Sequence, residues 1–367
     1  MARKLKTDKY LFLATLVLLG CSVVMVYSAS SAELAQDQRQ VSYYYFLRQL
    51  MWVVFGCVLL AGVMRVDYRL LKKSTLMWPG LILTGIALVA VLFSEEVNGT
   101  TRWFNLGPFG VQPSELAKIS IIIFTAAFLE KRMDRINEPS YALLPVAIVA
   151  GVVTGLILLQ PDFGTAVTVL VIVGAIVFTA GISYRYIIST ALVLLPTLAA
   201  ILWAAPYRRT RIFAFLDPFA DPTGAGYQLV QSLIAVGTGG VFGRGLMEGV
   251  QKLGYLPYPY TDFIYAVIAE ETGLIGATII LLCFVVVVWR GLHVARHAPD
   301  RFGALLALGL TVMIALQAYI NMSVVLGLLP TKGIPLPFIS SGGSSLLISL
   351  LGMGILLNVS QYASAET

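Results

Sequence analysis

The chain has 367 residues, of which 58% are hydrophobic and only 12% are charged, and its mean hydropathy is +0.85. This composition excludes an ordinary soluble domain and is typical of a protein that crosses a membrane several times. The net charge of +6 comes mainly from lysines and arginines in loops between apolar runs. It therefore indicates membrane orientation and does not predict a nucleic-acid partner.

Ten apolar runs follow one another along the chain, each long enough to cross the hydrocarbon core as a helix. Membrane helices tolerate the glycines and prolines that interrupt several of these runs. The first run is longer than the apolar part of a signal peptide and lacks a clear cleavage site, so we expect a retained helix. The predicted helices span residues 10–31, 49–66, 75–93, 114–130, 141–159, 164–181, 187–205, 263–289, 303–325 and 343–360.

The sequence therefore predicts an all-α, polytopic membrane protein with about ten transmembrane helices, in which residues 1–367 form a single integral membrane domain. Short loops on the side of the N-terminus carry more lysine and arginine, which predicts that both termini are cytoplasmic. The large extracytoplasmic loop is then 206–262, between helices seven and eight, too long for a simple connection. Its glycine run at 237–245 is expected to be a loop that either turns flexibly or cradles a substrate.

The outer side of this topology lacks histidine and cysteine. Cys21, Cys57 and Cys283 fall inside predicted helices, which predicts no disulfide framework, and His293 and His297 fall in a predicted cytoplasmic loop. A histidine-assisted nucleophile and a metal bound by histidine or cysteine are thereby excluded on the outer side. Carboxylates are the remaining general bases.

Asp262 is the best-placed carboxylate, because it begins predicted helix eight at the outer surface. The partial positive charge of a helix N-terminus favours a carboxylate, and Thr261 is a plausible N-cap. Asp262 either only caps the helix or acts as a base. Glu270 and Glu271 lie deeper in the same helix and point about 100° apart, so they cannot share one partner. We expect them to form hydrogen bonds inside the bundle.

Other polar side chains gather near the outer ends of predicted helices. Glu115 and Lys118 can face each other on one helix, either as a surface pair or inside the bundle. Asp162 lies in a short turn that it could itself form, whereas Arg48 and Trp103 could simply anchor the chain at the interface. A phosphate-bearing substrate in the outer leaflet would suit the cations of this face. These cations are Arg48, Arg102, Lys118, Arg208, Arg209, Arg211 and Lys332.

Several of these residues lie in motifs that resemble the SEDS family (shape, elongation, division and sporulation), to which the RodA and FtsW proteins belong. The resemblance runs nearly from end to end, and together its motifs are highly specific. They are GTTRWFNLGPFGVQPSELAK at 99–118, QPDFGTA at 160–166, DPFADPTGAGYQ at 217–228, QKLGYLPYPYTDFIYAVIAEETGLIG at 251–276 and LPTKGIPLPFISSGGSS at 329–345. QKLGYLP, LPTKG and VYSASS at 26–31 look more like FtsW, the division branch, than like RodA.

The resemblance implies an inverting peptidoglycan glycosyltransferase of the bacterial cytoplasmic (inner) membrane, which polymerises lipid II at the outer face. It implies a class B penicillin-binding protein and other division or elongation membrane proteins as partners. The essential family aspartate falls on Asp262. Lys118, Arg48 or a divalent cation (Mg²⁺ or Mn²⁺) would stabilise the departing pyrophosphate, and no metal ligands are assigned. The expected substrate-binding residues are Arg48, Trp103, Glu115, Lys118, Asp162 and, from the cationic face, Lys332.

The competing interpretation is a transporter that flips lipid II across the membrane. Many helices and intramembrane charges would suit it, yet no internal repeat is visible in the sequence. The polar residues also gather at the outer end, whereas a translocation route needs polar groups at mid-depth and on the inner side. The sequence therefore favours the polymerase.

Overall fold

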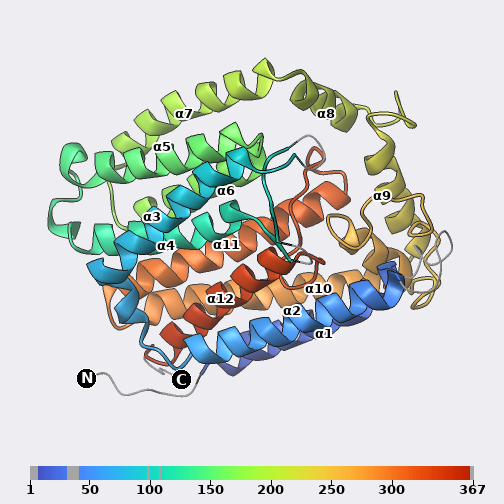
Figure 1. Cartoon of the computed structure of the whole chain (residues 1–367), viewed down its shortest axis with the longest axis horizontal. Helices are drawn as coiled ribbons and strands as arrows, with labels where there is room; N and C mark the ends of the chain where they lie inside the picture. Colours follow the sequence, from blue (N-terminus) through green and yellow to red (C-terminus); the bar gives the residue numbers. More distant parts are fainter. Residues whose placement is uncertain (1–6, 31–40, 97–99, 107–108, 364–367) are drawn as a thin grey trace.

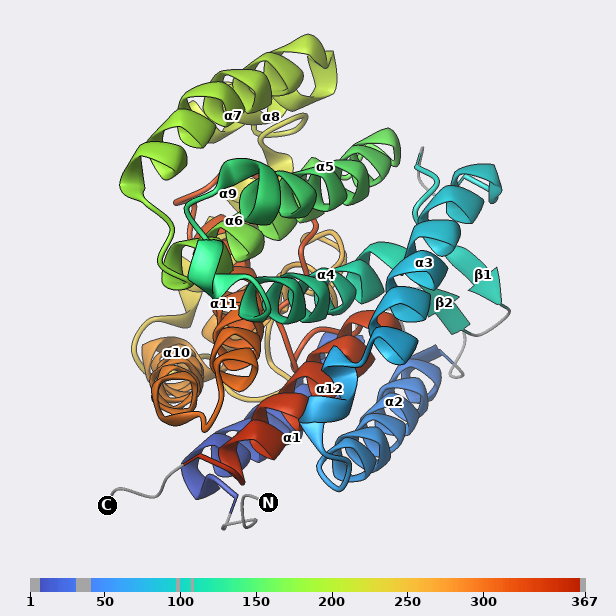
Figure 2. The same cartoon turned by 90° about the vertical axis from the view of Figure 1, so that its left-hand side faces the viewer.

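The computed structural model describes residues 7–30, 41–96, 100–106 and 109–363, and it is shown in two views in Figures 1 and 2. Long helices lie side by side and form one bundle. The backbone N–H of Asp8 donates to Ser360 Oγ over 3.3 Å, so the start of the first helix lies beside the end of the last. Helices α8 (Pro206–Leu216) and α9 (Tyr227–Gly239) lie toward the opposite end of the bundle (Figure 1).

Every predicted apolar run contains a helix. Eight helical segments are long and apolar enough to cross a membrane, so the chain is a multi-pass membrane protein. Of the other two, α4 includes three charged residues and α6 has 17 residues, and a count of ten crossings stays a prediction. The helices are α1 (Lys9–Ser30), α2 (Val41–Val63), α3 (Ser74–Ala90), α4 (Pro113–Glu130), α5 (Leu144–Leu159), α6 (Phe163–Thr179), α7 (Tyr184–Ala204), α10 (Ile264–His297), α11 (Arg301–Val325) and α12 (Gly343–Ser360).

The 206–262 segment contains two further helices, α8 (Pro206–Leu216) and α9 (Tyr227–Gly239). The prediction that Gly237 and Gly239 belong to a loop was therefore wrong. A side-chain carbon at Gly239 would lie 2.0 Å from the Ala269 carbonyl oxygen, so the missing side chain lets α9 pack closely on α10.

The prediction that His293 and His297 lie in a loop was also wrong, because both lie in the last turns of α10. Arg296 and His297 occupy its final turn, where cationic side chains complement the negative end of the helix dipole. The helix thus continues past the end of the apolar run.

Shorter elements connect the long helices. Strands β1 (Phe104–Leu106) and β2 (Phe109–Val111) pair antiparallel with Phe104 opposite Val111, directly before α4. The remaining short helical segments are η2 (Tyr68–Lys72), η3 (Val91–Phe93), η4 (Met133–Arg135) and the π-helix η5 (Pro139–Leu143).

The centre of the bundle is α11, which packs against α10, α4, α6 and α12, while α12 also packs against α2. Helix α7 differs, because none of its residues is buried although it is strongly apolar. It lies along the outside of the bundle in Figures 1 and 2. Such a surface is stable in a bilayer, where acyl chains replace water as the solvent.

Helix α10 is broken at Gly273, whose φ of 66° and ψ of −165° lie outside the helical region. Residues 240–245 lie against the break and bond to its free backbone groups. Leu274 N–H donates to the Gly240 carbonyl over 2.9 Å, and Gly245 N–H donates to the Glu271 carbonyl over 3.1 Å. The glycine run is thus neither a free turn nor an open cradle, because it completes the hydrogen bonding of a broken helix.

Glu270 binds the continuation of this loop, at residues 250–251. Its carboxylate accepts hydrogen bonds from the backbone N–H groups of Val250, over 2.8 Å, and Gln251, over 3.2 Å. The side chain is fully buried, and Arg244 lies 3.6 Å away. An acid in the apolar run is thus stabilised by backbone donors, which confirms the expectation of hydrogen bonds inside the bundle.

Candidate active site

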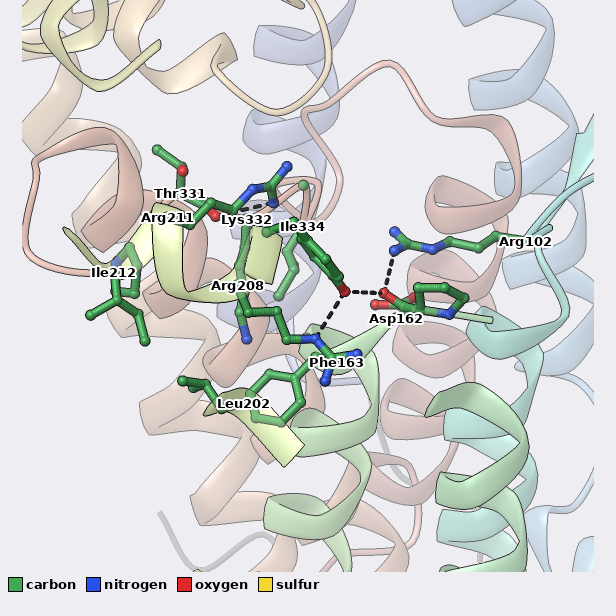
Figure 3. Close-up of a pocket in the computed structure, with 15 residues that line it drawn as sticks. Arg102, Asp162, Phe163, Leu202, Arg208, Arg211, Ile212, Thr331, Lys332 and Ile334 are labelled. Carbon is green, nitrogen blue, oxygen red and sulfur yellow. Dashed lines mark hydrogen bonds between the residues drawn. The ribbon is translucent and has the colours of Figure 1, made fainter. Parts of the chain in front are cut away.

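A pocket lies where the start of α6, helix α8 and the α11–α12 connection meet (Figure 3). Four separate stretches of chain contribute its charged side chains, because Arg102 comes from the segment before β1. The residues that line it are Arg102, Pro161, Asp162, Phe163, Gly164, Leu202, Tyr207, Arg208, Arg211, Ile212, Pro330, Thr331, Lys332, Gly333 and Ile334.

Asp162 forms one wall of this pocket. It is the N-cap of α6, and its Oδ1 accepts the Thr165 backbone N–H over 3.1 Å. Its Oδ2 accepts from the Gln112 side chain over 3.3 Å, which joins the start of α6 to the start of α4. Asp162 is therefore more than a turn former, because its fixed carboxylate also faces the pocket.

Four cationic side chains surround the pocket, and Figure 3 shows them converging from different elements. Arg102 donates to the carbonyls of Gln160 and Pro161, and Arg211 donates to the Thr331 carbonyl over 3.3 Å. The other two are Arg208 and Lys332.

These four cations bond to neutral groups. Arg208 donates to Tyr207 Oη over 2.9 Å, and Lys332 Nζ lies 4.5 Å from the centre of the Phe163 ring. Among the described residues, none of the four forms a direct salt bridge with a carboxylate.

Lys332 has an unusual environment for an ammonium group. Burial, together with the nearby charges of Arg208 and Arg211, lowers the pKa of Lys332 to about 8, and Asp162 opposes this change. An anion that enters the pocket would stabilise the charged form of Lys332, because it adds negative charge beside the buried ammonium group.

Asp262 lies behind the same wall. A side-chain carbon at Gly333, which lines the pocket, would lie 2.8 Å from Asp262 Oδ2, so the carboxylate lies directly against the Gly333 backbone. Burial raises the pKa of Asp262 to about 6, and Arg211 and Arg102 oppose this rise. This carboxyl group changes its charge near neutral pH, as a general base requires.

The expected capping role at the start of α10 was wrong. The N-cap residue is Phe263, no side chain caps the helix, and Thr261 Oγ1 instead donates to the Tyr258 carbonyl over 3.3 Å. The helix starts two residues later than a cap at Thr261 requires and one residue later than a cap at Asp262 requires, and the Asp262 carboxylate does not cap it.

Glu115 and Lys118 form a buried ion pair on the first turns of α4, with 2.7 Å between Oε1 and Nζ. Both side chains are at most 4% exposed, and within the described part of the chain Glu115 Oε2 has no hydrogen-bond partner. The pair is inside the bundle and not on its surface. It does not line the pocket of Figure 3, although α4 begins beside Gln112, which contacts Asp162.

Arg48 and Trp103 also lie outside the pocket lining. The Arg48 guanidinium lies 6.0 Å from the Tyr44 ring, and the Trp103 ring packs on the backbone of Gly110 in β2. The structure thus brings together Asp262, Asp162 and Lys332 but leaves Arg48, Trp103, Glu115 and Lys118 outside this pocket.

Among the cations of the outer face, Arg102, Arg208 and Arg211 line the pocket, yet the sequence did not single them out as substrate-binding residues. Arg208 and Arg211 are three residues apart and therefore project from one side of α8. That spacing was a usable signal. The contact between Arg211 and Thr331 joins residues 120 apart, and no local pattern predicts it.

Comparisons with known proteins agree with this fold and site. A family model described as "Cell cycle protein", covering FtsW, RodA and SpoVE, matches residues 9–365. A probable peptidoglycan glycosyltransferase FtsW from Geobacter sp. (strain M18) is 43% identical over 98% of both chains. The stage V sporulation protein E of Bacillus subtilis is 40% identical over 98% of this chain and 99% of its own.

Solved structures of related proteins have the same fold. A chain from a peptidoglycan synthase complex, described as coordinating polymerization and crosslinking, superposes with a TM-score of 0.79 at 30% identity, covering 97% of this chain and 98% of that one. The rod shape determining protein RodA of Thermus thermophilus superposes with a TM-score of 0.71 at 28% identity, covering 97% of both chains.

Proposed function

Because the chain belongs to the SEDS family and is an FtsW-like peptidoglycan glycosyltransferase, we propose that it joins lipid II units into glycan strands with Asp262 as the general base. The observation that supports this most directly is the position of the Asp262 carboxyl group against Gly333, at the wall of a pocket with four cationic side chains. A base and an anion-binding site are thus adjacent, as the transfer of a sugar from a pyrophosphate requires.

The reaction joins the 4-hydroxyl of the acceptor sugar to the anomeric carbon of the donor. Asp262 takes the hydroxyl proton as the new bond forms, and the bond to undecaprenyl pyrophosphate breaks. Attack from the face opposite the leaving group inverts an α-linked donor to a β-linked glycan in one displacement, without a covalent enzyme intermediate.

The departing pyrophosphate would bind the pocket cations. Arg102, Arg208 and Arg211 offer planar N–H donors suited to phosphate, and Lys332 adds a point charge. These groups bond to backbone carbonyls and a tyrosine hydroxyl before the substrate arrives, so they need little reorganisation to stabilise the charge that develops.

Four of the expected substrate-binding residues have supporting places in this proposal. Glu115 holds Lys118 at the start of α4, beside the pocket, where Lys118 and Arg48 would add to the positive field on the substrate. Trp103, next to Arg102, would contact the sugar or the headgroup layer.

A divalent cation fits one carboxylate of the pocket. Asp162 is the single acidic residue among the described lining residues, and Mg²⁺ commonly binds one or two carboxylates together with substrate phosphates. Asp162 would hold Mg²⁺ or Mn²⁺, which would screen the pyrophosphate charge. A chelator titration tests this proposal, because activity would then fall with free cation and Asp162→Asn would need a higher cation concentration.

The proposed setting is the bacterial cytoplasmic membrane, with the pocket at the outer face and both termini in the cytoplasm. The pocket lies between the start of α6 and helix α8, away from the end where α1 begins and α12 finishes (Figure 1), and the basic short loops lie on the side of the termini. A class B penicillin-binding protein that crosslinks the new strands is the proposed partner, with other division or elongation membrane proteins. The FtsW likeness favours division.

A lipid II flippase is less well supported. Translocation needs polar groups free to meet the substrate at mid-depth. The acids that could serve, Glu270 and Glu271, instead bind backbone N–H groups of the 240–252 loop.

The test compares the wild type with Asp262→Asn in detergent, each with and without a class B penicillin-binding protein whose transpeptidase is blocked. Lipid II and Mg²⁺ are supplied, and the products are separated on a gel. We expect a glycan ladder from the wild type only. Asp217→Asn is the matched control, because Asp217 is an exposed acid at the end of α8 in the same loop. A full ladder from Asp262→Asn would contradict the base assignment.

A further inference from the structure

Three consecutive backbone carbonyls lead into the start of α10, and each accepts a hydrogen bond from α11 or the connection that follows it. Ser341 N–H donates to the Tyr260 carbonyl over 2.9 Å, and Ser340 Oγ donates to the Thr261 carbonyl over 2.6 Å. Asn321 Nδ2 donates to the Asp262 carbonyl over 2.8 Å. The backbone that carries the proposed base is thus fixed at three successive residues.

Asn321 makes a second contact with the same amide nitrogen. Nδ2 also donates to the Ile334 carbonyl over 2.8 Å, and the side chain is 1% exposed. The Ile334 N–H in turn donates to the Lys332 carbonyl over 3.0 Å. One amide group therefore connects the peptide of Asp262 to the turn that carries Lys332 into the pocket (Figure 3).

We propose that Asn321 is a positioning residue for catalysis, which sets the place of the Asp262 carboxylate relative to Lys332 and the other pocket cations. The inference rests on the proposed function, because it assumes that Asp262 is the base. It adds a residue within an apolar helix that never touches the reacting atoms but holds the two groups that do.

The chemistry of the amide explains why asparagine serves here. Its two N–H bonds diverge from one nitrogen and satisfy two carbonyls from segments that approach α11 from different directions. Its Oδ1 finds no hydrogen-bond partner among the residues that the structure describes, so the amide is kept in place despite an unsatisfied buried acceptor. Leucine has nearly the same shape but no donors, and it would leave both carbonyls without this partner.

The close approach of Asp262 to Gly333 makes the place of the Asp262 carboxylate sensitive to small movements of the backbone. With Asp262 Oδ2 only 2.8 Å from where a Gly333 side chain would begin, a small relative movement of the two segments changes the place of the carboxylate. Misplacement of a reacting group by about 1 Å costs on the order of 100-fold in rate.

The test measures lipid II polymerisation by the full-length Asn321→Leu protein in detergent, with its penicillin-binding partner and Mg²⁺. We expect kcat to fall about 100-fold, with KM nearly unchanged because the pocket cations remain. We also expect the acid limb of the pH profile to move to lower pH, because a carboxylate released from the Gly333 backbone becomes better hydrated. A purely structural defect would not move that limb.

Two further variants complete the test. Ser340→Ala removes the neighbouring bond to Thr261 without altering α11, and it should show the same changes to a smaller extent. Thr311→Val is the matched control, since Thr311 is buried in the same helix but bonds only to Ala307 within it. Thr311→Val should keep wild-type kcat and pH profile.

The outcomes separate the two proposals. If Asp262→Asn is inactive but Asn321→Leu keeps the wild-type kcat and acid limb, the positioning role is overturned. If Asn321→Leu does not fold, Ser340→Ala takes its place in the test, and a wild-type kcat and acid limb in Ser340→Ala would overturn the positioning role. The positioning role is also overturned if activity falls only in proportion to the amount of folded protein, so that kcat per folded enzyme is unchanged. Full activity of Asp262→Asn would instead overturn the proposed base, and the inference with it.

Discussion

Lys252 Nζ lies 2.6 Å from Glu271 Oε1, and both side chains are at most 1% exposed. Ser28 Oγ from α1 donates to the same carboxylate over 2.6 Å, and Met247 N–H donates to its other oxygen over 3.1 Å. The acid inside the apolar run therefore holds the 240–252 loop, α1 and α10 together. Additional hydrogen bonds of this kind compensate part of the desolvation cost of a buried ion pair.

Replacing one member of this pair should loosen the loop. In Lys252→Met, the Glu271 carboxylate stays buried without its countercharge, and removal of one partner of a buried pair typically costs about 3–5 kcal/mol. We expect a lower Tm in detergent and faster proteolytic cleavage within 240–256. Lys131→Met, at an exposed lysine after α4, is the control. Unchanged cleavage in Lys252→Met would contradict this account of the loop.

The pH dependence of activity should have an acid limb near pH 6. Asp262 must be deprotonated to accept a proton, and burial raises its pKa to about 6. The value of kcat/KM should therefore rise as the pH increases through 6 and level off below the alkaline range. The measurement is polymerisation at limiting lipid II across this range. A limb near the ordinary pKa of 3.8 would show that a different or better hydrated acid is titrating.

The same pKa predicts that Asp262 destabilises the fold at neutral pH. Between 3.8 and about 6 the folded protein keeps a proton that the unfolded chain has released, so stability falls as pH rises through this window and stays lower above it. Asp262→Asn removes this cost and should be more stable than the wild type at pH 7, by about 1–3 kcal/mol. Thermal unfolding of both proteins tests this, and the difference should disappear below about pH 4. Equal Tm values at pH 7 would be inconsistent with it.

An alkaline limb should come from Lys332. Burial and the nearby arginines lower the pKa of Lys332 to about 8, so the ammonium loses its charge as the pH rises through this value. Binding of the pyrophosphate would then weaken, which should raise KM more than it lowers kcat. Arginine stays protonated at this pH, so Lys332→Arg should lack the limb. If the limb persists in that variant, another group causes it.

The helices were predictable because an apolar run of membrane length has few alternatives to a helix. Asp262, Asp162 and Lys332 could be selected as candidates because charged residues near apolar runs are few, and their roles stay predictions. No sequence pattern indicated the break at Gly273, because membrane helices tolerate glycine without breaking. The partner of the break, residues 240–245, is visible only in the folded chain.

Long-range contacts explain the other differences. Asn321 was not among the expected site residues, and its two acceptors lie 59 and 13 residues away along the chain. Threonine is a residue type that commonly caps helices, which made Thr261 a plausible N-cap. The backbone at 260–262 is instead held by hydrogen bonds from Ser340, Ser341 and Asn321, and α10 begins after this segment. At the site, long-range hydrogen bonds thus outweighed the local helix-capping preference of the sequence.

The buried pair on α4 offers a way to separate stability from catalysis. Lys118→Met leaves Glu115 buried without its countercharge, and Glu115→Gln leaves the Lys118 ammonium without its carboxylate, so each single change should lower the Tm. The double variant removes both charges and should recover most of the lost stability, since no unpaired charge remains. Polymerisation should nevertheless stay low in the double variant if Lys118 acts on the substrate charge. The measurements are Tm and glycan yield for the four proteins. Recovery of both would show that the pair is structural, whereas recovery of Tm alone would place Lys118 in substrate binding.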